Sequence, residues 1–148
     1  MNAGATVDVL LVEDNLDDAE FTLRALRKAN VALSVALVED GVAALEFVFC
    51  TGAYAQRMPS ALPRVVLLDL KLPKVGGLEV LRRIKADPRT RTLPIVVLTS
   101  SSEQHDVTQA YTAGANSYIV KPIEYAEIVA KLGDVVRYWL QLNETVSA

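Results

Sequence analysis

Several polar side chains follow directly on short apolar runs of the sequence. Glu13 and Asp14 follow the first run, Asp69 follows the third, and Thr99 and Lys121 follow the fourth and fifth. Carboxylates that lie close together repel one another unless a cation sits among them. A set of oxygen ligands fits Mg²⁺, which binds one or two carboxylates, keeps several waters and completes its shell on phosphate oxygens. If the fold brings these carboxylates together, the sequence predicts a magnesium site that handles phosphate.

The hydroxyl and the ammonium group suit the phosphate side of that chemistry. Thr99 can donate a hydrogen bond to a phosphoryl oxygen, and Lys121 can place a positive charge beside another. An aspartate with a metal beside it can act as a nucleophile and form an aspartyl phosphate. We therefore interpret these residues as a site for phosphoryl transfer onto a carboxylate.

The apolar runs themselves are typical of buried strands, because they are short, rich in Val, Ile and Leu, and lack polar alternation. They span residues 7–12, 35–38, 65–68, 95–98 and 118–120. Amphipathic segments of helical periodicity separate them. This alternation predicts an α/β fold, a doubly wound five-stranded parallel sheet in the flavodoxin-like order 2-1-3-4-5 with five helices. In that order the first and third strands are neighbours where ligands bind, at the carboxyl ends of the strands.

Length and charge limit the kind of protein this is. The chain has 148 residues, 51% of them hydrophobic, and a net charge of −3, which suits one folded domain without a basic face for nucleic acid or anionic membrane. It has no apolar run of the ~20 residues that a membrane span needs, and we expect no signal peptide, because no basic region leads into an apolar stretch at its start. We expect a cytoplasmic protein with one domain over residues 1–148, a core at about 7–142, and no effector domain.

Loop residues mark the expected ends of helices. Asp40-Gly41 is a helix start, and Ala113-Gly114 is a helix end. The connection at residues 51–63 exceeds the median of ~4–6 residues, and it is either a partner-binding loop or a tolerated surface insertion. Since the pair Glu39-Asp40 repeats Glu13-Asp14, composition alone does not decide which pair serves a metal. The strand order favours the first pair, because the second strand lies away from the third.

The motifs at the strand ends resemble the receiver domain of response regulators. The matching segments are Val-Glu-Asp-Asn at 12–15, Leu-Leu-Asp-Leu-Lys-Leu-Pro-Lys-Val-Gly-Gly at 67–77, Val-Leu-Thr-Ser at 97–100 and Tyr-Ile-Val-Lys-Pro at 118–122. The resemblance implies a non-enzymatic protein of a two-component system that accepts a phosphoryl group from a histidine kinase. The long connection, Leu-Pro-Lys and the closing Tyr-Trp-Leu are most similar to the single-domain regulators of bacterial phytochrome kinases, which implies a light-sensing pathway.

The same resemblance implies a role for each site residue. Asp69 is the expected phosphoacceptor. The expected Mg²⁺ ligands are Asp14, Asp69, the backbone carbonyl of Lys71, and Glu13 through water. Thr99 and Lys121 are expected to hold the phosphoryl group, with Thr99 and Tyr118 as the switch. One departure is Gly76, where the family usually has an Asp that caps the third helix; Gly caps less well by only a few tenths of a kcal/mol.

Three other functions compete with this interpretation. An aspartyl-phosphate phosphatase needs a general-acid Asp two residues after the nucleophile, where this chain has Lys71. A flavin-binding electron carrier presents backbone N–H groups to a phosphate after the first strand, where Glu13 and Asp14 repel an anion. A DNA-binding regulator needs an effector domain, and we expect none here, because the fifth helix is expected to run nearly to Ala148.

The fifth helix, expected from Ile123 to about Leu142, would be about 30 Å long. One apolar stripe is enough to cover the sheet. It comprises Ile128, Leu132, Val135, Trp139 and Leu142. A second stripe comprises Val129, Val136 and Leu140. We expect this second stripe to be exposed and to form a homodimer with the fourth helix and fifth strand, on a face that changes conformation on phosphorylation. The alternative is that it packs under the first helix or the terminal residues.

Overall fold

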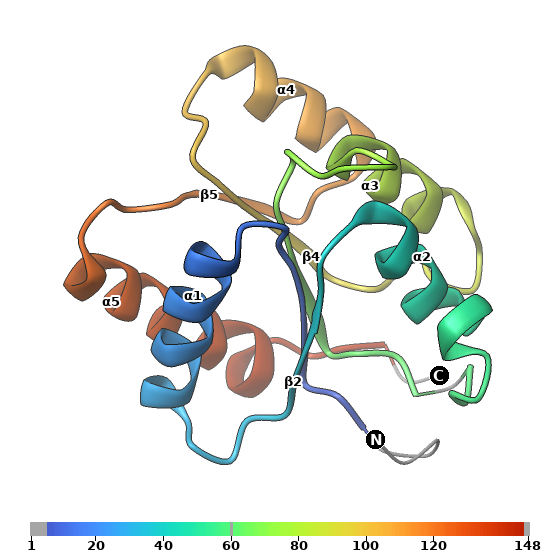
Figure 1. Ribbon diagram of the computed structural model, residues 1–148, viewed down its shortest axis with the longest axis horizontal. Helices are drawn as coiled ribbons and strands as arrows, with labels where there is room; N and C mark the ends of the chain where they lie inside the picture. Colours follow the sequence, from blue (N-terminus) through green and yellow to red (C-terminus); the bar gives the residue numbers. More distant parts are fainter. Residues whose placement is uncertain (1–5, 60, 147–148) are drawn as a thin grey trace.

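The computed structural model describes residues 6–59 and 61–146. A parallel sheet of five strands, in the order β2-β1-β3-β4-β5, forms its centre (Figure 1). The strands are β1 (Val9–Val12), β2 (Val35–Val38), β3 (Val65–Leu68), β4 (Ile95–Thr99) and β5 (Ser117–Val120). The predicted fold and strand order are confirmed, with β1 starting two residues later than the first apolar run.

Helices cover both faces of the sheet. They are α1 (Leu16–Ala29), α2 (Gly41–Phe49), α3 (Gly77–Ala86), α4 (Gln104–Ala113) and α5 (Tyr125–Val136). α1 packs against α5 on one face, and α3 packs against both α2 and α4 on the other (Figure 1). The predicted caps are confirmed: Asp40 accepts a hydrogen bond from the backbone of Ala43 at 2.7 Å, and Gly114 ends α4 with φ 110°. No helix in the described ranges is long and apolar enough to span a bilayer.

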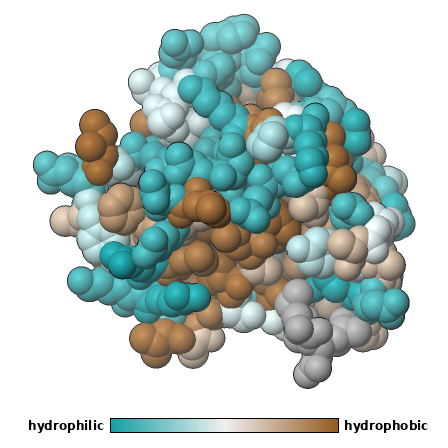
Figure 2. Space-filling model, in the orientation of Figure 1, coloured by the Kyte–Doolittle hydropathy of each residue, from teal (hydrophilic) through white to brown (hydrophobic). Residues whose placement is uncertain are grey.

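Burial follows the position of each strand in the sheet. β1, β3 and β4 are buried along their whole length, because helices cover them on both faces. The outer strands β2 and β5 are mostly half-buried. Figure 2 shows an apolar area across the middle of one face, in the region where Figure 1 draws β2, with polar helices around it.

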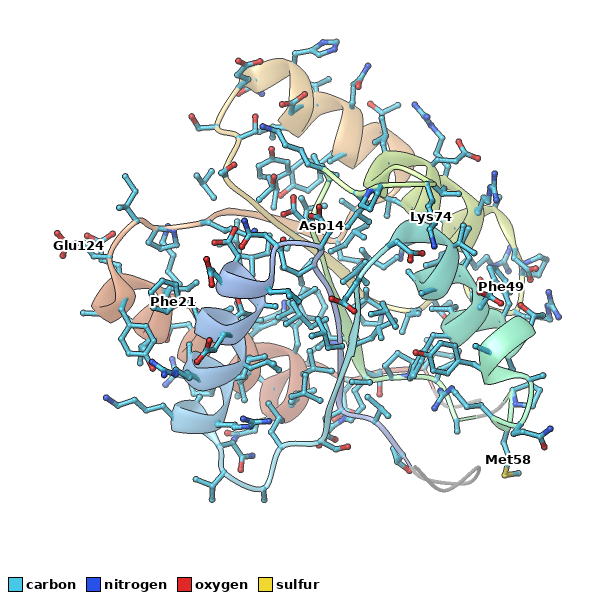
Figure 3. All side chains as sticks on the ribbon, in the orientation of Figure 1. Asp14, Phe21, Phe49, Met58, Lys74 and Glu124 are labelled. Carbon is cyan, nitrogen blue, oxygen red and sulfur yellow. The ribbon has the colours of Figure 1, made fainter. Side chains whose placement is uncertain are left out.

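The register of the strands aligns the predicted site residues. Val12 pairs with Leu68, and Leu68 pairs with Val97, so β1 and β3 end at one level of the sheet and β4 extends two residues further, to Thr99. Asp14 lies at this carboxyl edge, and Met58, in the connection between α2 and β3, lies at the opposite edge (Figure 3). The side chains that follow the strands therefore lie together at the carboxyl edge of the sheet.

The long connection after α2 is folded back onto its own helix. It contains a short 3₁₀ segment, η1 (Gly52–Tyr54), and Arg57, which is buried. The guanidinium of Arg57 lies 3.7 Å from the centre of the Phe47 ring and donates to the carbonyls of Phe47 and Ala61. The connection thus packs against its own helix, as expected for a tolerated surface insertion. The role of Arg57 in this packing was not predicted from the sequence.

The last helix departs from the predicted one. α5 begins at Tyr125 rather than Ile123, and after Val136 the chain continues as a π-helical segment, η2 (Arg137–Leu142). A π turn has i→i+5 hydrogen bonds, so the residues after it are rotated relative to an α-helical continuation. The predicted single α-helix to Leu142 is therefore wrong in its last six residues.

The expected exposed stripe on this helix is also wrong. Val136 and Leu140 are only 4% and 8% exposed, and they share a core cluster with Ala25 and Leu26 of α1. Leu142, expected to cover the sheet, is 65% exposed. The π turn and the packing of α1 against α5 account for this difference, and the alternative of packing under the first helix is confirmed.

Candidate functional site

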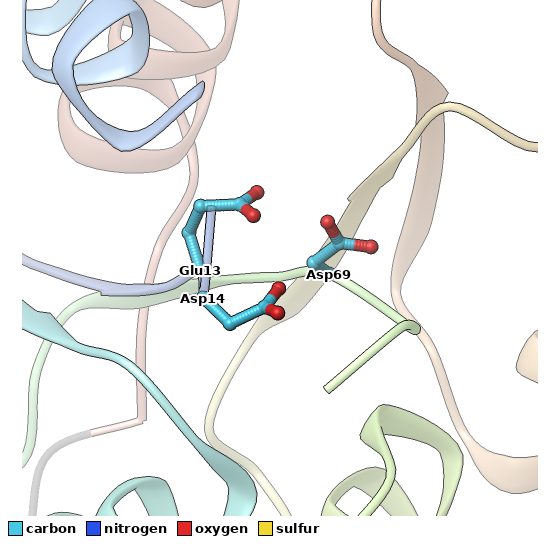
Figure 4. Close-up of side chains that lie close together, drawn as sticks. All are labelled: Glu13, Asp14 and Asp69. Carbon is cyan, nitrogen blue, oxygen red and sulfur yellow. The ribbon is translucent and has the colours of Figure 1, made fainter. Parts of the chain in front are cut away.

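Three carboxylates meet at the carboxyl edge of the sheet. Glu13 and Asp14 follow β1, and Asp69 follows the neighbouring strand β3. One oxygen atom of each lies within 4.8 Å of those of the other two, and Figure 4 shows the three side chains directed into one space. Glu13 and Asp69 are buried, whereas Asp14 is exposed. The tertiary structure thus brings together the three acidic residues that the sequence predicted.

Lys121 enters this cluster from the end of β5. Its ammonium nitrogen lies 2.5 Å from a Glu13 oxygen and 2.9 Å from Asp69 Oδ2. It is also 3.3 Å from Asp18 Oδ2, in the first turn of α1. One lysine therefore offsets part of the repulsion among the carboxylates.

Asp69 is held by donors at both of its oxygens. Oδ1 accepts from the Thr99 hydroxyl at 3.1 Å and from the Lys71 backbone N–H at 3.2 Å, while Oδ2 accepts from Lys121. Thr99 is fully buried and Asp69 is 8% exposed, so the hydroxyl has little freedom to turn away. Asp69 is therefore the fixed centre of the site.

The electrostatic effects differ between the two buried carboxylates. Burial raises the pKa of Glu13 to about 7, although hydrogen bonds from Lys121 and the Asn15 backbone act in the opposite direction. Burial also acts to raise the pKa of Asp69, but the hydrogen bond from Lys121 and its positive charge outweigh it, and this pKa is lowered. For Lys121, burial acts to lower the pKa, and the bonds to Glu13 and Asp69 raise it instead. Asp69 and Lys121 are consequently an ion pair at neutral pH.

The donor set fits a divalent metal of the magnesium type. Three carboxylates of which one is exposed offer oxygen ligands with an open side for water and phosphate, which is what Mg²⁺ selects. The remaining charge of the cluster also needs a cation, since one ammonium faces several carboxylates. The acidic cluster therefore suits Mg²⁺, as predicted.

A second group of hydrogen bonds involves the loop that follows Thr99. The Tyr118 hydroxyl donates to the Ser101 carbonyl at 2.9 Å, and the Ser101 hydroxyl donates to Asp106 Oδ2 at 2.5 Å. Both contacts tie the loop after β4 to β5 and α4. Thr99 and Ser101 also line a hollow of about 230 Å³ between this loop and the connection after β3. Tyr118 is thus hydrogen-bonded to the loop that directly follows Thr99.

The structure separates the two acidic pairs. Asp40 caps α2 with one oxygen, and its other oxygen lies 3.3 Å from the Lys74 ammonium. The second pair thus serves α2 rather than the cluster around Asp69. Asp18, which contacts Lys121, was missed by the sequence analysis; its signal was its position four residues after Asp14 in the first turn of a helix.

Comparison with known proteins agrees with this geometry. Residues 9–133 match the family model described as the response regulator receiver domain. The chain belongs to the response regulator receiver family. It is thereby a signalling domain of the two-component type, and its sheet of order 2-1-3-4-5 is the receiver fold.

Individual relatives of this receiver domain come from different pathways. The probable methanogenesis regulatory protein FilR2 of Methanothrix harundinacea is 38% identical over 137 residues, which cover 93% of this chain and 86% of that protein. The crystal structure of the phosphorylated cyanobacterial phytochrome response regulator RcpA matches with a TM-score of 0.87 and 34% identity, over 97% of this chain and all of that one. The bacteriophytochrome response regulator AtBRR matches with a TM-score of 0.75 and 45% identity, over 95% of this receiver domain and 99% of its own chain.

Proposed function

We propose that this receiver domain accepts a phosphoryl group on Asp69, in a Mg²⁺-dependent reaction, from a histidine kinase. The observation that carries the proposal is the Asp69 carboxylate itself. It is buried at the end of the central strand β3, it is held by Thr99 and Lys121, and it faces Glu13 and Asp14. The lowered pKa of Asp69 keeps it ionised, which a nucleophilic carboxylate requires.

In this reaction one oxygen of Asp69 forms a bond to phosphorus while the bond from phosphorus to its donor breaks. Thr99 and Lys121 would then bind oxygens of the transferred group, since both already contact Asp69. Asp14, Asp69, the Lys71 carbonyl and, through water, Glu13 would hold Mg²⁺. The metal would supply positive charge for the oxygens of the phosphoryl group.

The proposed output passes through Thr99 and Tyr118. A phosphoryl oxygen that binds Thr99 draws the hydroxyl away from Asp69, and the loop that carries Ser101 follows Thr99 directly along the chain. Because the Tyr118 hydroxyl bonds the Ser101 carbonyl, a shift of this loop would release or move Tyr118. Tyr118 is half-buried on β5, so such a movement would change the face formed by α4, β5 and α5.

The proposed phosphoryl donor is a phytochrome histidine kinase, which implies a cytoplasmic, light-sensing pathway. The similarity to a cyanobacterial and a bacterial phytochrome regulator over almost the whole chain supports this choice. Apolar side chains close to the site also support a protein donor: Leu16, Phe21 and Ile123 are 65%, 46% and 101% exposed. Phe21 and Ile123 line a hollow that also includes Lys121.

We further propose a homodimer through α4, β5 and α5. The support is a groove of about 700 Å³ along β5, the second half of α5 and the start of η2. Its lining includes Tyr118, Ile119, Lys131, Asp134, Tyr138 and Trp139. It combines aromatic rings with one charge of each sign, so two copies related by a twofold axis can pair Lys131 with Asp134. Light scattering of Tyr138→Asp should then give half the mass of the wild type; a wild-type monomer in both phosphorylation states would contradict the dimer.

The experiment that tests the function is intact-mass measurement after incubation with acetyl phosphate. The wild type should gain one phosphoryl group in Mg²⁺ and none in EDTA. Asp69→Asn should gain none, while Asp87→Asn, which changes an acidic residue outside the cluster that pairs with Arg89, should react. A full adduct on Asp69→Asn would contradict the assignment of Asp69.

Comparing two phosphoryl donors, a phytochrome kinase and acetyl phosphate, tests whether the kinase binds the exposed apolar surface. Ile123→Glu should slow transfer from a phosphorylated phytochrome kinase about tenfold or more, because it places a charge on the exposed apolar surface beside the site. Its reaction with acetyl phosphate should remain at the wild-type rate. Equal rates with the kinase in wild type and variant would show that this surface does not bind the donor.

A further inference from the structure

The connection between β3 and α3, residues 69–76, carries Asp69 and Lys71. Lys71 sits in it as an exposed residue whose backbone N–H bonds Asp69, and its carbonyl is a proposed metal ligand. Such a connection needs support from neighbouring elements if it is to hold a carbonyl in place. Two glycines, each at the first position of a helix, provide close contacts to it.

Gly77, the first residue of α3, packs against the start of the connection. Its N–H donates to the Leu70 carbonyl at 3.0 Å, and a Cβ atom on Gly77 would lie 2.3 Å from the carbonyl oxygen of Asp69. Gly77 follows this connection directly in the sequence, so a contact here is expected from the chain path alone.

Gly41, the first residue of α2, packs against the far end of the same connection. Its N–H donates to the Pro73 carbonyl at 3.4 Å, and a Cβ atom on Gly41 would lie only 1.8 Å from the Val75 carbonyl oxygen. No side chain fits between these two backbones. α2 is remote in sequence from this connection, so the contact exists only in the folded chain.

Asp40 adds a side-chain link between the same two segments. One oxygen caps α2 and the other lies 3.3 Å from the ammonium of Lys74, which takes the left-handed conformation with φ 67°. Figure 3 shows Lys74 over the end of α2 that faces α3. The backbone bond from Ala43, followed by the contact with Lys74, lowers the pKa of Asp40. Asp40 is therefore ionised and held from both sides.

From these contacts we infer that Asp40 and Gly41 are positioning residues for the metal site, although neither contacts the acidic cluster. They fix the end of the connection from outside, as Gly77 fixes its start, and together they set where the Lys71 carbonyl lies. This inference rests on the proposed function, since it assumes that this carbonyl binds Mg²⁺. It also gives the second acidic pair, Glu39-Asp40, a role distinct from that of Glu13-Asp14.

The test compares substitutions at two glycines: Gly41, which contacts the connection, and Gly76, which is its last residue. Gly41→Ala places a methyl group where the Val75 carbonyl now lies, so the connection must shift. Gly76→Ser is the control, because a Cβ atom on Gly76 meets nothing within 4 Å and serine is a favoured cap for α3. Calorimetric titration with Mg²⁺ should show binding about tenfold weaker in Gly41→Ala, as for other supporting residues of metal ligands, and unchanged in Gly76→Ser.

The phosphorylation rate with acetyl phosphate separates positioning from loss of fold. In Gly41→Ala the Mg²⁺ concentration for half-maximal rate should rise about tenfold, while the rate at saturating Mg²⁺ returns to near the wild-type value. A folded Gly41→Ala with wild-type Mg²⁺ affinity would overturn the inference, as would an equal loss in Gly76→Ser. A wild type that binds no Mg²⁺ would instead contradict the proposed function itself.

A measurement on the wild type covers the case in which Gly41→Ala does not fold. Coupling between two sites is reciprocal, so Mg²⁺ should slow hydrogen exchange of the Gly41 amide, which bonds the Pro73 carbonyl. We expect a slowing of several-fold by nuclear magnetic resonance in Mg²⁺ relative to EDTA. An unchanged exchange rate of this amide would overturn the inference.

Discussion

Lys121 and Lys85 lie at opposite edges of the sheet and differ in what surrounds them. Lys121, at the carboxyl edge, contacts the carboxylates of Glu13, Asp69 and Asp18. Lys85 extends from the last turn of α3 toward the amino edge. Its ammonium donates to the carbonyls of Arg91 and Leu93 at 3.1 and 2.7 Å, and to the side-chain oxygen of Asn116 at 2.8 Å.

The two lysines consequently differ in charge balance. Burial lowers the pKa of Lys85, which has neutral oxygen partners. Lys121 is half-buried, as Lys85 is, but its carboxylate partners raise its pKa. The Asn116 oxygen also accepts from the Ile95 backbone at 2.9 Å, so Lys85 joins α3 to the segments before β4 and β5. Lys85, whose partners are neutral oxygens, therefore joins elements of the fold. Lys121 lies among more carboxylates than it can neutralise, and this leaves a charged site that a metal and an anion can enter.

The largest effect expected from this comparison is on phosphorylation. Lys121→Met should lower the rate with acetyl phosphate about a hundredfold, because the charge that stabilises the transferred group is lost. Lys85→Met should react at the wild-type rate once folded. Quantifying the phosphorylated fraction over time by intact mass compares the two; equal losses would show that the lysines do not differ in function.

The next effect concerns metal affinity at the carboxyl edge. Asp14→Ala should weaken Mg²⁺ binding by tenfold or more, since it removes a proposed ligand. Lys121→Ala should leave Mg²⁺ affinity unchanged or higher, because a neighbouring cation is removed. Calorimetric titration measures both, and an equal loss in the two variants would contradict the division of roles between them.

A third effect distinguishes the lysines by stability. Lys85→Met should lower the free energy of unfolding by about 1–3 kcal/mol, since two carbonyls and the Asn116 oxygen lose their donor. Urea denaturation in EDTA measures this change. Lys85→Arg keeps the charge and donors and serves as the control; a wild-type midpoint for Lys85→Met would show that this lysine does not join the three segments.

The smallest effect is expected at Asp18. Its side chain is 46% exposed and lies 3.3 Å from the Lys121 ammonium, and such pairs contribute little because solvent screens them. Asp18→Asn should therefore change the phosphorylation rate by less than about threefold. A loss as large as that of Lys121→Met would place Asp18 in the site itself.

The sequence determined the sheet and the members of the acidic cluster. Apolar runs, caps and strand ends are local features, and a parallel sheet necessarily gathers its strand ends on one rim. Asp40 was assigned to a helix cap and Asp14 to the metal on this basis. The strand order separated two pairs with the same local sequence, and the structure places both pairs accordingly.

Tertiary structure alone decided which side of the last helix is buried. Val136 and Leu140 have the spacing of an extra apolar face, yet α1 covers both, and a π turn directs Leu142 outward. Likewise the contact of Asp18 with Lys121 and that of Gly41 with Val75 depend on partners far away in the chain. Periodicity reports which residues of an element share a face, but the neighbour that covers the face is chosen by the packing of the whole chain.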